Sequence, residues 1–127
     1  MRNGDSFRAR PHAYPDPMAL PHPLPDELAA LIAARFRLLA EPMRIKLLDR
    51  LRGGEASVQE LAAAVGTTKQ NVSKHLGALA AAGVVGRRKD GNFVYYRVVD
   101  EGIWQLCHDV CGSVERRLGE LQDLLAG

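Results

Sequence analysis

Hydrophobic residues in the first part of the chain recur at three- and four-residue intervals, which is the spacing of an amphipathic helix. The pattern predicts a first helix over residues 27–40, with Asp26 as its N-cap. Its apolar positions are Leu28, Leu31, Ile32, Phe36 and Leu39. Pro42 suits the start of a second helix, expected over 43–52 and ended by a Gly-Gly pair. The inward positions of this second helix are expected to be Ile45, Leu48 and Leu51.

Two shorter helices separated by a three-residue turn are predicted next. Ser57 and Glu60 have the spacing of a capping box and open a helix over 58–65. The turn, residues 66–68, begins with glycine and ends in two threonines, whose hydroxyls can cap a further helix that runs to about residue 82. Two helices joined by so short a turn are typical of a helix-turn-helix, whose second helix reads the major groove of DNA.

After residue 83 the pattern changes from helical to strand-like. Asp90-Gly91 separates a short strand from the β-branched and aromatic run 93–99, and Asp-Gly between two such runs favours a tight hairpin with a type I′ turn, which needs positive φ at both central positions. The tip carries three successive cations and is predicted to be a wing. A last helix over 101–125 has one apolar stripe. The predicted fold is mostly α with a small β-hairpin, a winged helix-turn-helix of order α-α-α-α-β-β-α.

The length of 127 residues fits one domain and a tail. Residues 1–26 hold six of the seven prolines, so they are predicted to be a flexible arm before a domain over 27–125. The chain has neither an apolar run long enough for a membrane span nor the apolar core of a secretory signal, so we expect a cytoplasmic protein with no membrane partner.

The charges are unevenly distributed. Residues 57–99 carry six cations against two carboxylates, net +4, whereas residues 100–127 carry two against six, net −4. A basic middle section can bind a polyanion through one face while the acidic section stays clear of it, so double-stranded DNA is the favoured partner. A solvated charged surface without a partner is the alternative.

Four stretches of the chain resemble one family in their order and content. They are residues 39–45 (LAEPMRI), 57–62 (SVQELA), 71–76 (NVSKHL) and 88–97 (RKDGNFVYYR). These stretches resemble the ArsR/SmtB family of bacterial winged-helix repressors. The resemblance implies a symmetric homodimer built from the first and last helices, binding to an operator, and release when an inducer is sensed. The residues expected at that dimer interface are Leu28, Leu31, Ile32, Phe36, Ile103, Val110, Val114, Leu118 and Leu121.

Helical phase selects the residues that face DNA. With Val72 at the centre of the buried face, Gln70, Lys74 and their neighbours lie on the far side. The predicted contacts of the helix-turn-helix are Thr67, Thr68, Lys69, Gln70, Asn71, Ser73 and Lys74, and those of the wing are Arg87, Arg88 and Lys89. His75 lies nearer the buried face. Of Tyr95 and Tyr96, one should pack against the helices, and the pattern leaves open which.

Cys107 and Cys111 lie four residues apart on the last helix and therefore on one side of it. Two thiolates at this spacing can chelate a soft metalloid such as arsenite, supply two ligands of a zinc or cadmium site, or be oxidised or persulfidated. They can equally be two small packed hydrophobic residues. The metal sites usual in the family are largely missing, because helix 58–65 has no cysteines and His108 has no second histidine at metal-binding distance.

The sequence therefore predicts a dimeric DNA-binding repressor whose inducer acts at Cys107 and Cys111, with no certain cofactor. Constitutive or differently triggered repression with structural cysteines, and zinc or cadmium sensing, remain as alternatives. An enzyme is not expected, because the cysteines lack a histidine base, Cys-x-x-Cys spacing and a glycine-rich phosphate loop. A protein-interaction module without DNA binding is a further alternative, which the cationic wing disfavours.

Overall fold

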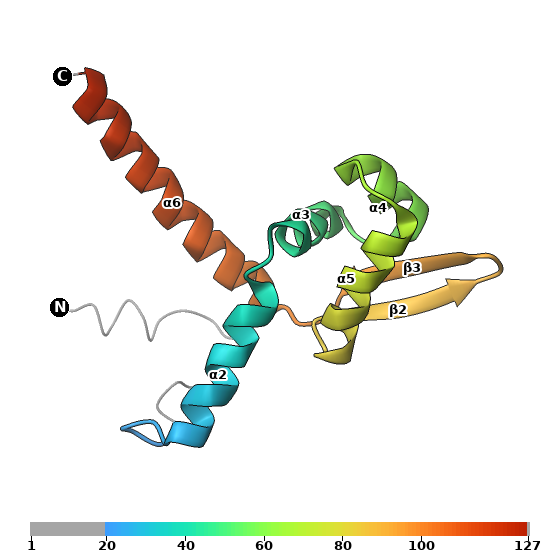
Figure 1. Ribbon diagram of the computed structural model, residues 1–127, viewed down its shortest axis with the longest axis horizontal. Helices are drawn as coiled ribbons and strands as arrows, with labels where there is room; N and C mark the ends of the chain where they lie inside the picture. The colour runs from blue at the N-terminus through green and yellow to red at the C-terminus, as the bar shows by residue number, and fades with distance from the viewer. Residues whose placement is uncertain (1–19, 127) are drawn as a thin grey trace. The chain divides into compact units, whose positions relative to one another are not determined.

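A computed structural model describes residues 20–126 of the chain (Figure 1). The elements are α2 (Asp26–Leu39), α3 (Pro42–Arg50), the 3₁₀ turn η2 (Leu51–Gly53), β1 (Ala56–Ser57), α4 (Val58–Val65), α5 (Lys69–Ala81), β2 (Val85–Asp90), β3 (Phe93–Val98) and α6 (Gly102–Ala126). Two compact units divide the described residues, one ending at Asp100 and the other containing α6. The predicted fold class is confirmed.

The predicted boundaries of the first two helices need small corrections. Asp26 is not the N-cap of α2: that position is Pro25, and Asp26 with Glu27 forms an acidic first turn that suits the positive end of the helix dipole. The second helix begins at Pro42, as its fixed φ favours, but the regular helix ends at Arg50. Most of the predicted arm, residues 1–19, lies outside the described residues.

The core of the first unit lies among α3, α4, α5 and the start of β2. Its most deeply buried side chains are Leu47, Leu48, Leu61, Val72, Leu76, Leu79 and Val84. The expectation that Ile45 faces inward was wrong, since it is 49% exposed, and Leu47 takes the buried position instead. The face of α3 that meets α4 and α5 therefore runs through Leu47 and Leu48, and Leu51, in η2, is also buried as predicted. Burying side chains of this size stabilises the fold by roughly 1.5–3 kcal/mol each.

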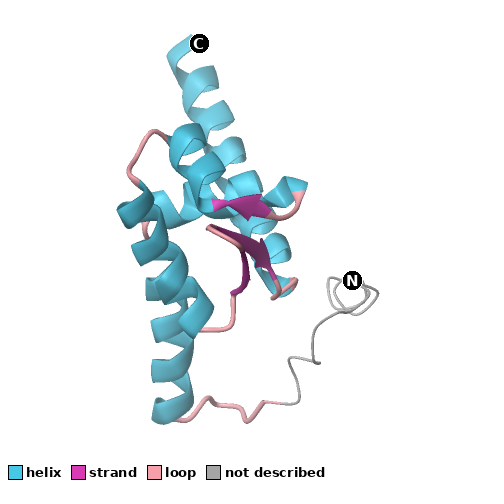
Figure 2. Ribbon diagram, turned by 90° about the vertical axis from the view of Figure 1, so that its right-hand side faces the viewer, coloured by secondary structure: helices cyan, strands magenta, loops and turns pink. Residues whose placement is uncertain are grey.

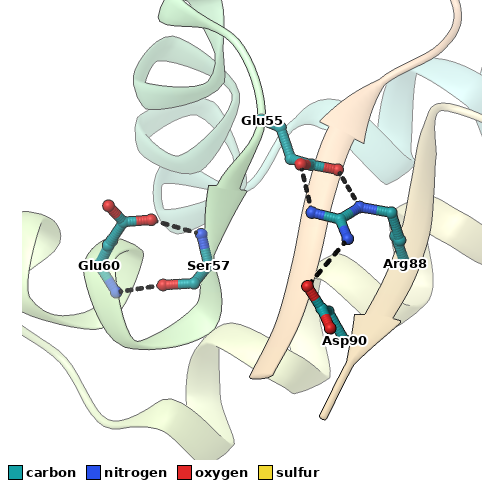
Figure 3. Close-up of polar contacts among 5 residues, drawn as sticks. All are labelled: Glu55, Ser57, Glu60, Arg88 and Asp90. Carbon is teal, nitrogen blue, oxygen red and sulfur yellow. Dashed lines mark hydrogen bonds and ion pairs between the residues drawn. The ribbon is translucent and has the colours of Figure 1, made fainter. Parts of the chain in front are cut away.

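The start of α4 is fixed by the predicted capping box (Figure 3). Ser57 Oγ accepts a hydrogen bond from the backbone N–H of Glu60 at 3.1 Å, and the backbone N–H of Ser57 donates to Glu60 Oε1 at 2.8 Å. The helix ends at Gly66, whose φ of 73° is in the left-handed region that glycine adopts without strain.

The three strands form an antiparallel sheet in the order β1-β3-β2, drawn in magenta in Figure 2. The sequence pattern did not reveal β1, which is only two residues long and pairs Ala56 with Tyr96. In the hairpin, Asp90 pairs with Phe93, so the turn is Gly91-Asn92. Positive φ occurs at Gly91 and not at Asn92, as in the first central position of a type II′ turn, so the expected type I′ turn was wrong.

The described part of the second unit contains α6, a helix of 25 residues. Along it Ile103 is buried, whereas Val110, Val114, Leu118 and Leu121 are exposed. Among the described residues, no helix combines the length and apolarity that crossing a membrane requires.

Candidate DNA-binding interface

Helix α5 separates buried apolar positions from exposed polar ones. Val72, Leu76 and Leu79 are buried, while Lys69, Gln70, Ser73, Lys74 and Gly77 are exposed. The predicted phase of the helix is therefore confirmed. The exposed face carries hydrogen-bond donors and acceptors together with two cations, which are the groups that base edges and phosphates require.

The turn before α5 fixes the first residues of that helix. Thr68 is the N-cap, and its Oγ1 accepts a hydrogen bond from the backbone N–H of Asn71 at 3.0 Å. Thr67 Oγ1 accepts a second bond from Asn71 Nδ2 at 3.1 Å. The bond to Thr67 therefore orients the half-buried Asn71 side chain at the edge of the exposed face, while Thr68 holds the Asn71 backbone.

His75 belongs to the inward side of α5, as the sequence suggested. It is buried, and its Nδ1 accepts a hydrogen bond from Arg44 Nε at 3.1 Å. Burial lowers the pKa of His75, and the nearby charges of Arg44 and Lys74 lower it further, while Glu41 acts in the opposite direction. The imidazole is therefore neutral at physiological pH and can serve as the acceptor.

A second arginine connects α2 to the end of α5. Arg35 Nη1 donates to the carbonyl oxygen of Ala82, the C-cap of α5, at 3.1 Å. Arg35 Nη2 lies 3.7 Å from Asp100 Oδ2. Helix α2 therefore contacts the residues that follow both α5 and β3.

The two faces of the wing carry different side chains. Val85, Arg87 and Lys89 share the face of buried Tyr96, so Tyr96 is the tyrosine that packs inward. Arg87 and Lys89 are exposed, and neither has an ion-pair partner within the part of the chain that the structure describes. Arg88 projects from the opposite face.

Arg88 is held by two carboxylates and one aromatic ring (Figure 3). Its Nη2 and Nε donate to Glu55 at 2.7 and 3.0 Å, and its Nη1 lies 3.6 Å from Asp90 Oδ2. The guanidinium carbon lies 4.5 Å from the centre of the Tyr95 ring. Hydrogen bonding to Arg88 lowers the pKa of Glu55, and the same bond raises that of Arg88.

Exposed apolar side chains lie on α2 and, separately, on α6. On α2, Leu31 is 69% exposed and Phe36 is 54% exposed, whereas Leu28 and Ile32 are half-buried. On α6, four predicted interface residues are exposed, each at a three- or four-residue interval from the next: Val110, Val114, Leu118 and Leu121. Both helices thus carry an apolar surface that the single chain leaves open.

Neither Cys107 nor Cys111 of α6 forms a disulfide within the described residues. Cys107 is half-buried and Cys111 is exposed. Two thiolates provide only two metal ligands, and within residues 20–126 no cluster of three or more His, Cys, Asp or Glu side chains is placed to hold a metal ion. A zinc or cadmium ion, which prefers four ligands, would need additional donors.

Known proteins that are similar to this chain also have a helix-turn-helix and a wing. A helix-turn-helix domain family matches residues 39–88. The transcriptional regulator KmtR of Mycobacterium tuberculosis is 40% identical over 95 residues, which cover 75% of this chain and 73% of KmtR. The transcriptional repressor SmtB of Mycobacterium tuberculosis is 37% identical over 94 residues, which cover 74% of this chain and 67% of SmtB. The chain belongs to the ArsR/SmtB family. Members of this family are DNA-binding transcriptional regulators and not enzymes.

Two solved structures extend the comparison to the fold. The antimony-specific transcriptional repressor AntR has a TM-score of 0.71 and 28% identity, covering 85% of this chain and 99% of AntR. A homodimeric winged helix-turn-helix DNA-binding domain from Mycobacterium bovis has a TM-score of 0.66 and 31% identity, covering 79% of this chain and 95% of that domain. The expected resemblance to winged-helix repressors is confirmed.

Sequence reasoning missed the residues that hold the interface in place. Arg35, Arg44 and Glu55 each contact a residue more than 30 positions away. Their partners are a carbonyl, an imidazole and another charged side chain, and no local spacing marks such pairs. One sequence feature could have pointed to such a pair: the three successive cations at 87–89 repel one another, which favours a carboxylate near one of them.

Proposed function

We propose that this ArsR/SmtB protein is a dimeric repressor that binds operator DNA through α5 and the wing and releases it when an inducer reacts at Cys107 and Cys111. The observation that carries the DNA-binding part is the exposed polar face of α5, opposite Val72 and Leu76. The reducing cytoplasm, where free thiols persist, is the expected compartment.

Each residue of the proposed interface has a role that its chemistry suits. Gln70 and Asn71 can each pair with an adenine through two hydrogen bonds, and Lys74 can donate to guanine or to a phosphate. The remaining predicted residues would contact phosphates: Thr67, Thr68, Lys69 and Ser73. On the wing, Arg87 and Lys89 have exposed cationic groups that suit phosphates or the adjacent minor groove. Arg88, the third cation predicted to contact DNA, is hydrogen-bonded to Glu55 instead.

The proposed dimer uses the apolar faces of α2 and α6. Exposed Leu31 and Phe36 on one helix, and Val110 to Leu121 on the other, would lose contact with water against a second copy. The full proposed interface is Leu28, Leu31, Ile32, Phe36, Ile103, Val110, Val114, Leu118 and Leu121. The homodimeric relative from Mycobacterium bovis supports a second copy as the partner.

The proposed sensor is the pair of thiols on α6. The exposed Cys111 is accessible to a reagent, and Cys107, four residues earlier, lies on the same side of the helix. Soft thiolate ligands favour a metalloid such as arsenite, and exposure also allows oxidation or persulfidation. The antimony specificity in the name of AntR supports the metalloid alternative. The half-buried state of Cys107 favours a second candidate, a repressor whose cysteines only pack.

A selection experiment tests this function. The purified, reduced protein is incubated with a random-sequence duplex pool at low salt, and the bound duplexes are sequenced. We expect an inverted repeat with half-sites about one helical turn apart, and release of the selected duplex by arsenite or a persulfide donor. Failure to enrich any sequence would refute the DNA-binding proposal, whereas enrichment without release by any thiol reagent would refute the sensor.

A further inference from the structure

The geometry around Arg88 gives this residue a role other than DNA contact. Every nitrogen of its guanidinium already has a carboxylate near it: Nε and Nη2 bind Glu55, and Nη1 lies beside Asp90 (Figure 3). The paired bonds of 2.7 and 3.0 Å have the two-pronged geometry that makes arginine–carboxylate pairs strong and directional. A phosphate could bind the Nε–Nη2 edge of Arg88 only by displacing Glu55.

The Tyr95 ring restricts the same side chain further. The guanidinium carbon lies 4.5 Å from the ring centre, within the range of a cation–π contact. Tyr95 is also the residue directly opposite Arg88 in the hairpin. Both strands of the wing therefore contribute to holding Arg88, and Glu55 adds a contact from outside the hairpin.

The ion pair between Arg88 and Glu55 lies at the point along the wing where the third strand ends. Strand β1 pairs with β3 only as far as Ser57 and Tyr95, the level at which Arg88 lies on β2. Beyond this level the wing is a two-stranded hairpin, which by itself is only marginally stable. Glu55 thus reaches the wing where its third strand ends.

Glu55 is also close in sequence to the start of the helix-turn-helix. Two residues later, Ser57 is the N-cap of α4 and exchanges two hydrogen bonds with Glu60. Figure 3 shows this capping box on one side of the segment and the Arg88 ion pair on the other. A single short segment, residues 55–57, therefore holds both α4 and the wing.

We infer that Arg88 is a positioning residue, which together with Glu55 and Asp90 fixes the direction of the wing relative to the helix-turn-helix, and that Arg87 and Lys89 make the wing's contacts with DNA. The inference rests on the proposed DNA-binding function. A protein that grips DNA with a helix and a wing gains affinity when both are held in the binding geometry before contact.

The experiment measures DNA affinity by fluorescence anisotropy, at several salt concentrations, on a duplex selected by the wild-type protein. The variants are Glu55→Gln, Arg88→Lys, Arg88→Ala and the double variant Glu55→Gln/Arg88→Ala. Glu55→Gln and Arg88→Lys nearly preserve size, so folding is expected to survive, and thermal melting verifies it. Arg117→Ala is the matched control, because Arg117 forms an exposed ion pair with Glu120 within α6.

We expect Glu55→Gln, Arg88→Lys and Arg88→Ala each to weaken binding about three- to tenfold, and the double variant to lose no more than Arg88→Ala. The loss in Glu55→Gln is diagnostic, since removing a negative charge near DNA would by itself strengthen binding. The slope of log affinity against log salt should stay at the wild-type value in Arg88→Ala. Binding by Glu55→Gln that equals or exceeds wild type, or a salt slope reduced by about one in Arg88→Ala, would overturn the inference.

Amide hydrogen exchange on the free protein provides a readout that does not depend on DNA. Amides of residues 93–98 should exchange faster in Glu55→Gln than in wild type and at the wild-type rate in Arg117→Ala. Equal exchange in Glu55→Gln and wild type would also overturn the inference. If the wild-type protein selects no duplex, the proposed function fails, and the exchange rates still decide whether Glu55 holds the wing.

Discussion

Arg44 joins α2 to the recognition helix through His75. Its Nε donates to His75 Nδ1 at 3.1 Å, and its Nη1 donates to the carbonyl oxygen of Leu38 at 2.9 Å. Leu38 lies in the last turn of α2, Arg44 in α3 and His75 in α5. One side chain therefore links the helix proposed to bind a second copy with the helix proposed to read DNA.

This contact predicts that stability depends on pH. The pKa of His75 is lowered in the folded state, chiefly by burial and then by Arg44 and Lys74, so the unfolded chain binds a proton more readily. The contribution is fully present above the ordinary histidine pKa of about 6.5 and decreases as the pH falls below it. Urea unfolding between pH 8 and 5 should show this decrease, and His75→Gln should make the curve flatter. An equally steep curve in His75→Gln would contradict the assignment to His75.

Replacing Arg44 should destabilise the protein. Arg44→Ala leaves the buried Nδ1 of His75 without its donor, and an unsatisfied buried polar group costs about 1–3 kcal/mol. Urea unfolding at pH 7.5 measures the loss. Arg52→Ala is the control, because Arg52 forms an exposed ion pair with Asp49, three residues away, and it should change the free energy of unfolding little. Equal losses in the two variants would show that the Arg44–His75 bond contributes nothing specific.

Features that depend on residues close together in the sequence could be predicted, whereas features that depend on residues far apart in the sequence could not. The capping box at Ser57 and the buried phase of α5 are local patterns, and both were predicted correctly. The direction of Ile45 was not, because the side of α3 that faces the core is decided by α4 and α5. The pairing of Arg88 with Glu55, 33 positions apart, depends on the register of the sheet. A strand of two residues such as β1 is too short to leave a recognisable pattern in the sequence.

Gly77 offers a test of how closely α5 approaches DNA. A Cβ at this position would meet no atom within 4 Å in the free protein, and alanine favours a helix over glycine by about 0.8–1 kcal/mol. Gly77→Ala should therefore raise the melting temperature while weakening DNA binding severalfold. Gly119→Ala on α6 has the same free space and serves as the control, with the gain in stability and no loss in affinity. Unchanged affinity in Gly77→Ala would show that the backbone there stays away from the duplex.

If the thiols are the sensor, both Cys107 and Cys111 are required for induction. Cys107→Ser and Cys111→Ser should each bind the selected duplex with wild-type affinity yet fail to release it when arsenite or a persulfide donor is added. Ser113→Ala, at another exposed position of α6, should release normally. Normal release by both serine variants would instead assign the thiols to packing.

Gln70 lies on the exposed face of α5, and if this face reads DNA sequence, replacing Gln70 must change which base pairs the protein prefers. Binding of wild type and Gln70→Ala is measured against every single-base-pair change in the selected duplex. Gln70→Ala should lose about 1–3 kcal/mol of discrimination at one base pair in each half-site and keep it at the others. Discrimination identical to wild type at every base pair would contradict the claim.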